Sequence, residues 1–302
     1  QPTLFPYTTL FRSALPGGHE VPYYILPPVY MRLPSSSSVR QYHNIYWYGP
    51  IFYSQETVVP GMAEHIRPGE RDEDRHDRTR LVPWVDFGRI DSAKVLVVGA
   101  GALGNEAVKD LALFGFHHLD VLDMDSVVRS NLSRCVLFRE GDQSSGKGKA
   151  SLVAERAREL DPELQVTAIE GRVQSLGPEE MKRYDIILGC LDNVTARLHM
   201  NANAYHARVP YVDGGTDGFR GRVQAVVPPM TPCLQCGMNR SHFRILERRF
   251  SCTGQDTVFY QPKRAAEITT TSIIAAVQVR EAVKILSGRP AISHVMHYDG
   301  VA

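Results

Sequence analysis

Three charged side chains in this sequence could act together on a phosphate group. Arg134 and Lys149 both follow a strand-like segment that ends at Asp123. Asp192 follows a second apolar segment, 184–189. Two cations near a phosphate stabilise negative charge that moves during transfer of a phosphoryl or nucleotidyl group. A carboxylate at the end of a parallel strand can hold Mg²⁺ against phosphate oxygens. Their joint placement indicates chemistry on a nucleoside triphosphate.

A glycine-rich turn precedes these residues and could bind the phosphates. The apolar run 95–98 leads into it, and the segment 105–114 after it has the pattern of a helix. The glycines of the turn are Gly99, Gly101 and Gly104. Glycine lets the backbone turn tightly and approach a ligand, and the start of a helix offers free N–H groups to phosphate. Nicotinamide and flavin sites use the same kind of turn, so the turn alone leaves the nucleotide open.

Asp123 is placed to bind the ribose of that nucleotide. It ends the predicted strand 118–123, about 20 residues after Gly104, which is the usual offset for a carboxylate that accepts hydrogen bonds from ribose hydroxyls. This residue suits NAD as well as ATP. Arg134 and Lys149 favour ATP, because a dehydrogenase needs no such cations for hydride transfer.

The elements that must position these residues alternate between strands and helices. Buried parallel strands are apolar throughout, because both of their faces are covered. This alternation predicts an α/β fold with a Rossmann-like, doubly wound and mostly parallel sheet. The segment 221–227 alternates like a half-exposed strand, so we expect the C-terminal half of the sheet to be mixed. The predicted strands are 95–98, 118–123, 164–169, 184–189, 211–213, 221–227 and 292–298, and the main predicted helices are 105–114, 149–160, 195–207 and 271–286.

The composition is that of a globular protein with balanced charge. Among the 302 residues, 43% are hydrophobic and 22% are charged. Lys plus Arg number 34 and Asp plus Glu number 33, a balance that does not favour a nucleic acid or a membrane surface as partner. The sequence contains no apolar stretch near the roughly 20 residues of a membrane helix. We therefore expect neither a membrane nor a nucleic-acid partner.

Two cysteines have the spacing of metal ligands. Cys233 and Cys236 form a CxxC after a Pro-rich turn, which suits half of a tetrahedral zinc site. The sequence lacks a second CxxC, and we expect that pair to lie beyond the C-terminus. A redox CxxC is the alternative interpretation, although such a motif usually begins a helix.

The other cysteines divide into one reactive candidate and two packing residues. Cys252 lies among polar and turn residues with basic residues nearby in the sequence, a setting that favours a thiolate. Cys135 and Cys190 stand next to apolar residues and are expected to pack in the core. Five cysteines without a paired pattern favour a reducing, cytoplasmic location.

Short motifs extend over most of the chain, from Arg75 to Leu286. They are RHDR at 75–78, DMD at 123–125, SNLSR at 130–134, GKGK at 146–149, LDN at 191–193, DGGTDGF at 213–219, CLQC at 233–236 and CT at 252–253. Together they resemble the ThiF/MoeB family, the adenylating fold shared with ubiquitin-activating enzymes. Two features differ from the family pattern. The linker between Arg134 and Lys149 is longer than usual, and the second zinc pair is absent.

The resemblance implies a site for Mg·ATP. Asp123 and Asp125 would bind the ribose, and Asn131 would bind phosphate or ribose. The two cations described above, together with Mg²⁺ held by Asp192, would stabilise charge on the phosphates. The implied reaction is adenylation of the C-terminal carboxylate of a ubiquitin-like or sulfur-carrier protein that ends in Gly-Gly, with release of pyrophosphate.

The resemblance also implies roles for three further regions. Arg78 would reach into the active site of a neighbouring subunit, which implies a homodimer. Cys233 and Cys236 would form the first half of the family's zinc site. Cys252 would take the activated acyl group as a thioester or take part in sulfur transfer.

Alternative functions remain at this point. A non-catalytic scaffold subunit of a heterodimeric activating enzyme is one, and the intact set of Arg134, Lys149 and Asp192 argues against it. An NAD-dependent dehydrogenase is another, but no residue has the pattern of a hydride-transfer base. A branch of the family that modifies transfer RNA is disfavoured by the near-neutral charge.

The sequence further predicts three regions along the chain. Residues 3–13 resemble a translated sequencing adapter, and 14–60 are rich in Pro, Tyr and Ser without helical or strand periodicity. We therefore expect 1–61 to be an artefact or a disordered segment. Residues 62–90 are expected to form an N-terminal arm, and 91–302 an ATP-binding adenylation domain that is truncated at its C-terminus.

Overall fold

The computed structural model describes residues 74–237 and 265–301, together with the backbone of four short strands nearer the N-terminus. The chain divides into two compact units, residues 1–71 and 72–302. Two antiparallel pairs of strands are described in the first unit, although the sequence from residue 14 onward shows no strand periodicity there. Two-stranded ribbons of this size cannot bury a core of their own. The pairs are β1 (Leu10–Ala14) with β2 (Glu20–Tyr24), and β3 (Met31–Arg32) with β4 (Val39–Arg40).

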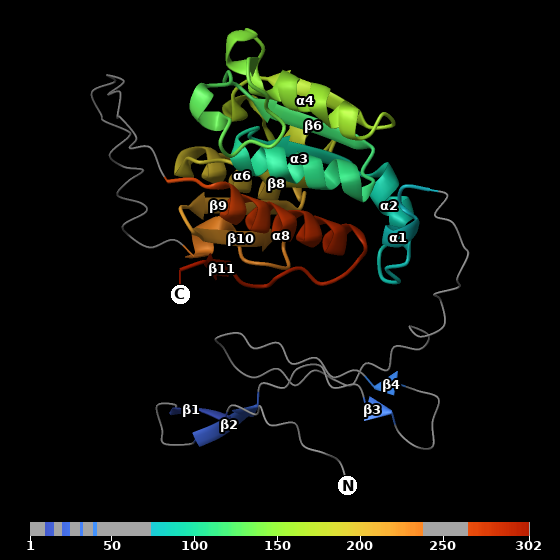
Figure 1. Cartoon of the computed structure of the whole chain (residues 1–302), viewed down its shortest axis with the longest axis vertical. Coiled ribbons are helices and arrows are strands. Elements are labelled where there is room, and N and C mark those ends of the chain that lie inside the picture. The colour runs from blue at the N-terminus through green and yellow to red at the C-terminus, as the bar shows by residue number, and fades with distance from the viewer. Residues whose placement is uncertain are drawn as a thin grey trace. The chain divides into compact units, whose positions relative to one another are not determined.

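The second unit is built on a sheet that, among the described residues, has seven strands in the order β11-β10-β9-β8-β5-β6-β7 (Figure 1). The strands from β7 to β9 are parallel, whereas β10 and β11 pair antiparallel with their neighbours. This confirms the Rossmann-like, mostly parallel sheet with a mixed C-terminal half. The strands are β5 (Lys94–Val98), β6 (His118–Asp123), β7 (Gln165–Glu170), β8 (Ile186–Gly189), β9 (Tyr211–Asp217), β10 (Arg220–Val226) and β11 (Met296–Asp299).

The chain reverses its direction of travel across the sheet between β5 and β8. From β5 the chain continues to β6 and β7 on one side, and from β8 it continues to β9 on the other. In sheets of this kind, ligands bind outside the carboxyl ends of the strands at such a reversal. The glycine turn follows β5 and Asp192 follows β8, so the topology brings both to the place where sheets of this kind have their ligand-binding crevice.

Helices cover both faces of the sheet. The helices α3, α4 and α8 pack with one core and α5 and α6 with the other, and Figure 1 shows α3 and α8 side by side in front of the strands. Alternate residues of β5 enter the two cores, Val95 and Val97 on one face and Leu96 and Val98 on the other. This explains the uninterrupted apolar pattern of β5. The helices are α1 (Asp77–Arg80), α2 (Phe87–Ser92), α3 (Ala102–Phe114), α4 (Lys149–Leu160), α5 (Pro178–Met181), α6 (Val194–Ala207) and α8 (Ile268–Leu286).

Some element boundaries differ from the expected ones for identifiable reasons. Helix α8 begins at Ile268 rather than 271, because the side chain of Glu267 accepts hydrogen bonds from the N–H groups of its first turn. Strand β9 continues to Asp217 rather than ending at 213. Gly214 lies inside this strand because the side chain of Gln278 occupies the space that a Cβ would need, at 2.3 Å from Gln278 Oε1.

The remaining regular segments are short. Four 3₁₀ turns are described, η1 (Arg129–Asn131), η2 (Asp142–Ser144), η3 (Val173–Ser175) and η4 (Leu234–Gly237). Among the helices of the described residues, none combines the length and apolar character that crossing a bilayer requires.

Candidate nucleotide-binding site

The glycine turn after β5 has a separate physical reason for each glycine. Gly99 has φ +99°, and a Cβ there would lie 2.5 Å from the carbonyl oxygen of Cys190. A Cβ on Gly104 would lie 1.8 Å from the carbonyl oxygen of Gly99, so only glycine lets α3 pack this closely on the turn. Gly101 is the N-cap of α3, and a Cβ there would meet no other atom within 4 Å. The turn therefore leaves open space in front of the N-terminus of α3, where an anion is favoured.

Asp123 holds this turn from the end of β6. Its Oδ2 accepts a hydrogen bond from the N–H of Ala100 at 2.7 Å, and its Oδ1 accepts one from the N–H of Asp125 at 2.8 Å. Burial raises the pKa of the Asp123 carboxyl, while these two backbone hydrogen bonds oppose the rise. Each carboxylate oxygen can accept a second hydrogen bond, so the group can still receive a ribose hydroxyl.

Lys149 and Asp125 form an ion pair beside the turn. The Nζ of Lys149 lies 2.9 Å from Oδ2 of Asp125, and the backbone N–H of Lys149 donates to the carbonyl of Asp125 at 2.8 Å. The side chain of Lys149 is only 11% exposed, whereas that of Asp125 is 56% exposed. The structure thus joins the start of α4 to the loop after β6, an arrangement that sequence spacing did not predict.

Asn131 and Arg134 lie on the loop between β6 and α4. Asn131 is buried, and its Oδ1 accepts a hydrogen bond from the N–H of Val128 at 3.0 Å. The guanidinium of Arg134 donates to the carbonyl of Ser130 and is partly exposed. Asn131 therefore shapes the turn from which Arg134 projects.

Asn105 is a positioning residue that the sequence analysis missed. It is fully buried, and its Nδ2 donates to the carbonyls of Ala100 at 2.8 Å and Gly101 at 3.0 Å. Its Oδ1 accepts from the N–H of Leu137 at 3.0 Å. One side chain thus links the glycine turn to the loop that carries Arg134. Asparagine is a poor helix former, so its presence in the first turns of an apolar helix is a signal that could have identified this residue.

Asp192 lies on the other side of the crevice, between β8 and α6. The N–H of Cys190 donates to the carbonyl of Val98 at 2.8 Å, so the chain still pairs with β5 just before Asp192. The next residue, Asn193, caps α6 by accepting a hydrogen bond from the N–H of Ala196 at 2.7 Å. Asp192 itself is exposed, so its carboxylate is accessible to a ligand.

Arg78 does not lie in this crevice. It belongs to α1, and the neighbouring His76 packs against Gly115, the C-cap of α3. The glycine turn is at the opposite end of α3, whose 13 residues span roughly 20 Å. Arg78 therefore stands at the far end of this helix from the turn of its own chain.

The described cysteines fall into two classes. The Sγ atoms of Cys233 and Cys236 lie 3.6 Å apart on the turn at η4, close to the roughly 3.8 Å between two thiolates on a tetrahedral Zn²⁺. Cys135 and Cys190 are buried, as expected, and burial raises the pKa of the Cys135 thiol to about 11. Cys252 lies outside the described residues.

Comparison with known proteins places the chain in a family. The model of the ThiF family matches residues 76–301. The NEDD8-activating enzyme E1 catalytic subunit of Caenorhabditis elegans is 35% identical over 201 residues, which cover 61% of this chain and 46% of that protein. The SUMO-activating enzyme subunit 2 of Dictyostelium discoideum is 38% identical over 152 residues, covering 50% of this chain and 23% of that protein. The chain thus spans less than half the length of either relative.

Solved structures agree on the fold. Escherichia coli MccB, in a crystal structure with ATP, matches with a TM-score of 0.60 and 20% identity, covering 76% of this chain and 72% of MccB. A crystal structure of MccB with the peptide MccA gives a TM-score of 0.62 at the same identity. At this identity the likeness shows a shared fold alone. The family match, in contrast, covers nearly all of the domain whose crevice is described above, and the chain therefore belongs to the ThiF family.

Proposed function

We propose that this chain belongs to an ATP-dependent enzyme that adenylates the C-terminal carboxylate of a ubiquitin-like or sulfur-carrier protein. The observation that carries the proposal is the open, glycine-lined N-terminus of α3 at the crossover of the sheet, with Asp123 beneath it and Asp192 on the loop after the neighbouring strand β8. The relatives named as NEDD8- and SUMO-activating enzymes, and the MccB structure with ATP, support the choice of reaction and nucleotide.

ATP binding would use the groups that face this crevice. The phosphates would meet the N–H groups at the start of α3, next to Gly101. Asp123 and Asp125 would accept hydrogen bonds from the ribose hydroxyls. Asn131 would act on ribose or phosphate by way of the loop that it shapes. Asp192 offers the carboxylate oxygens that Mg²⁺ prefers, and the ion would neutralise phosphate charge there.

The reaction brings two anions together, so the site must supply positive charge. An oxygen of the carrier's carboxylate would form a bond to the α-phosphorus, and the bond from that phosphorus to the bridging oxygen would break as pyrophosphate leaves. Arg134 and Lys149 would stabilise the charge that builds up on the phosphate oxygens. Lys149 has three N–H donors, so it can contact phosphate while it keeps its pairing with Asp125.

We also propose that two copies of the chain form a homodimer. Arg78 stands far from the glycine turn of its own chain, which supports its action in the crevice of the partner. Beside α1, an apolar groove of about 470 Å³ lies between α3 and α8, with Trp84, Phe114 and Val283 in its lining and the exposed side chain of Leu113 at its edge. A second copy is the occupant that would bring Arg78 to a crevice.

The cysteines complete the proposal. Cys233 and Cys236 would supply two of the four ligands of a structural Zn²⁺, and their 3.6 Å spacing fits that ion. Cys252 would attack the acyl adenylate as a thiolate, forming a thioester and releasing AMP. The described cysteines are unpaired, which suits a reducing, cytoplasmic compartment.

ATP–pyrophosphate exchange tests the central step. We expect exchange that requires both Mg²⁺ and a carrier protein ending in Gly-Gly. An Arg134→Ala variant should lower the exchange rate by about 10² to 10³, because it removes one transition-state cation. Arg139→Ala is the matched control, since this exposed arginine on the same loop hydrogen-bonds only to nearby carbonyls among the contacts described. Measurable ATP binding without exchange with any such carrier would refute the proposal and favour a scaffold subunit.

A further inference from the structure

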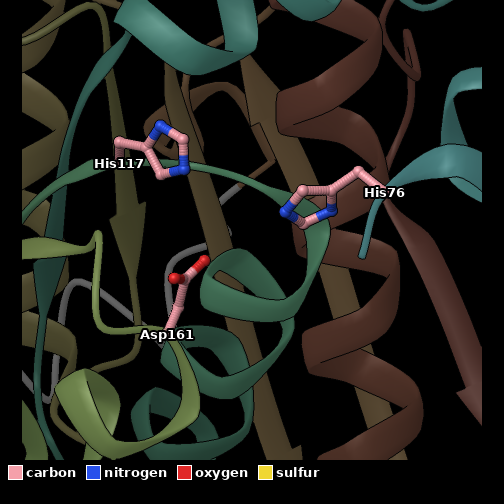
Figure 2. A group of neighbouring side chains, drawn as sticks. All are labelled: His76, His117 and Asp161. Atoms are coloured by element: carbon pink, nitrogen blue, oxygen red, sulfur yellow. The ribbon is translucent and has the colours of Figure 1, made fainter. Parts of the chain in front are cut away.

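A second cluster of reactive side chains lies at the opposite end of the sheet from the nucleotide crevice. Its members are His76, His117 and Asp161, which Figure 2 shows turned toward a common space. His76 is the N-cap of α1, His117 precedes β6, and Asp161 ends α4 just before β7. The cluster therefore sits at the amino ends of the parallel strands, whereas the crevice sits at their carboxyl ends.

Two of these side chains are buried, His117 is half-buried, and each has a polar atom without a hydrogen-bond partner. His76 is 8% exposed and Asp161 is 1% exposed. Within the described part of the chain, no hydrogen bond reaches Nδ1 or Nε2 of His76, Nε2 of His117 or Oδ2 of Asp161. The exposed carboxylate of Glu163 comes within 4.0 Å of His117 Nε2, which is too far for a hydrogen bond. Leaving a buried polar atom unpaired costs free energy, because its lost contact with water is not replaced. Several such atoms directed at one space indicate a bound group that satisfies them together.

The surrounding contacts prepare these atoms for a cation. Oδ1 of Asp161 is already used by Nη1 of Arg75 at 2.7 Å and by the N–H of Glu163 at 3.1 Å, which leaves Oδ2 free to face the cluster. Nδ1 of His117 lies 2.5 Å from Oδ1 of Asp91. When Nδ1–H donates to Asp91, Nε2 carries the lone pair, which is the usual arrangement of a metal-binding histidine with its carboxylate partner.

The donor set selects a class of ion. Two imidazole nitrogens and one carboxylate oxygen suit Zn²⁺ and similar transition-metal ions, whereas Mg²⁺ and Ca²⁺ prefer oxygen ligands alone. The three donor atoms lie within 4.8 Å of one another, and donors around tetrahedral Zn²⁺ are roughly 3.4 Å apart. Small side-chain rotations would close this difference. Gly115 leaves room for the His76 ring, because a Cβ there would come within 3.2 Å of it.

We propose that His76, His117 and Asp161 bind one divalent transition-metal ion of the Zn²⁺ type, with a fourth position left for water. The ion ties α1 to the ends of α3 and α4, elements that are distant in sequence. Metal binding at this site is independent of the proposed adenylation. Only one consequence depends on the proposed adenylation: by fixing α1, the ion would also position Arg78 for that reaction.

Metal titration of the chelator-treated full chain tests the site. The parent for this test is the Cys233→Ser/Cys236→Ser variant, which removes the other metal-binding candidate. We expect it to retain one Zn²⁺ per chain after dialysis, and to gain a Co²⁺ spectrum with d–d bands but no thiolate charge-transfer band. Failure of this parent to retain any ion would overturn the proposal.

Substitutions of the proposed ligands distinguish this site from adventitious metal binding. In the same parent, His117→Ala should lose the bound ion, and Asp91→Asn should bind it about 10- to 100-fold more weakly. The control is His118→Ala, since His118 is the neighbouring histidine but lies outside the cluster. Zn²⁺ should raise the Tm of the parent and of His118→Ala but not the Tm of His117→Ala. Circular dichroism spectra of all three proteins without metal check that each one is folded. Equal Zn²⁺ affinity in His117→Ala and its parent would contradict the assignment.

Discussion

At the scale of single residues, the candidate site depends on side chains that shape the backbone as well as face the ligand. Asp123 accepts the N–H of Ala100 and so holds the glycine turn that it would share with a nucleotide. Asn105 makes a comparable link from within α3 to Leu137. A substitution at such a position changes the geometry of the whole crevice, so its effect on binding exceeds the loss of one contact.

Gly101 and Gly104 should respond differently to the same substitution. Gly104→Ala places a methyl group against the carbonyl of Gly99 and should lower the free energy of unfolding by about 1–3 kcal/mol. Gly101→Ala meets no neighbouring atom, so it should leave stability within about 0.5 kcal/mol and weaken ATP binding, because the methyl group occupies space for phosphate. Urea unfolding and ATP titration measure the two effects. Unchanged ATP affinity in Gly101→Ala would show that phosphate does not approach this turn.

At the scale of elements, helices in this domain are fastened to the sheet by buried polar contacts as well as by apolar packing. Arg197 of α6 donates from Nε to Oδ1 of Asp213 on β9 at 2.9 Å, and the hydroxyl of Tyr211 donates to the same oxygen at 3.0 Å. Gln278 of α8 donates to the carbonyls of Gly189 and Val212, each at 3.0 Å. Hydrogen bonds therefore fix a helix to the sheet on each of its two faces near the crevice.

Breaking the pair of Arg197 and Asp213 should be costly. Asp213→Asn removes the charge that compensates a buried guanidinium, so the free energy of unfolding should fall by about 3–5 kcal/mol. Asp217→Asn is the matched control, because Asp217 is exposed at the end of the same strand. Chemical unfolding of both variants provides the comparison. Similar losses in the two would mean that the buried pair contributes nothing specific.

The N-cap of α8 predicts a pH-dependent contribution to stability. Burial acts to raise the pKa of Glu267, but hydrogen bonds from Thr269 and Thr270 outweigh it and lower the pKa to about 2. A depressed carboxyl pKa stabilises the fold above the unfolded value of about 4.3, and that contribution is lost as pH falls toward 2. Glu267→Ala should therefore cost about 1 kcal/mol near pH 7 and progressively less below pH 4. Tm measured against pH for both proteins checks this, and a difference that does not vary with pH would contradict it.

At the scale of the whole molecule, the proposed function requires two copies. Helix α1 carries Arg78 at one end of α3, and the glycine turn is at the other. One chain therefore holds both parts of the proposed site without bringing them together. The proposed symmetric dimer would join each crevice to the arm of the other chain.

Complementation between inactive chains tests this arrangement. Arg78→Ala and Asp192→Ala should each abolish most exchange activity. When the two are mixed and allowed to exchange subunits, half of the dimers should be mixed, each with one intact site, so about a quarter of the sites should recover. Mixed dimers without any recovery, verified by two affinity tags, would show that Arg78 does not act across the dimer.

Local sequence patterns predicted most of the fold and part of the site. The strands from β5 to β8 follow from apolar runs, and α4 was placed from Lys149 to the stop before Pro162. Gly99 and Gly104 were identified because the spacing of a phosphate-binding turn is itself a local property. Small boundary differences arose where a cap such as Glu267 extends a helix.

What the sequence alone determined is the set of local elements and the residue types at their ends, because periodicity and spacing act over a few residues. Only the tertiary structure decided which of those ends meet. It paired Lys149 with Asp125, placed Arg78 away from the turn of its own chain, and gathered His76, His117 and Asp161 at the other end of the sheet. These contacts join residues far apart in the chain. They exist because the crossover order of the strands and the packing of α1, α3 and α4 bring separate segments to the same place.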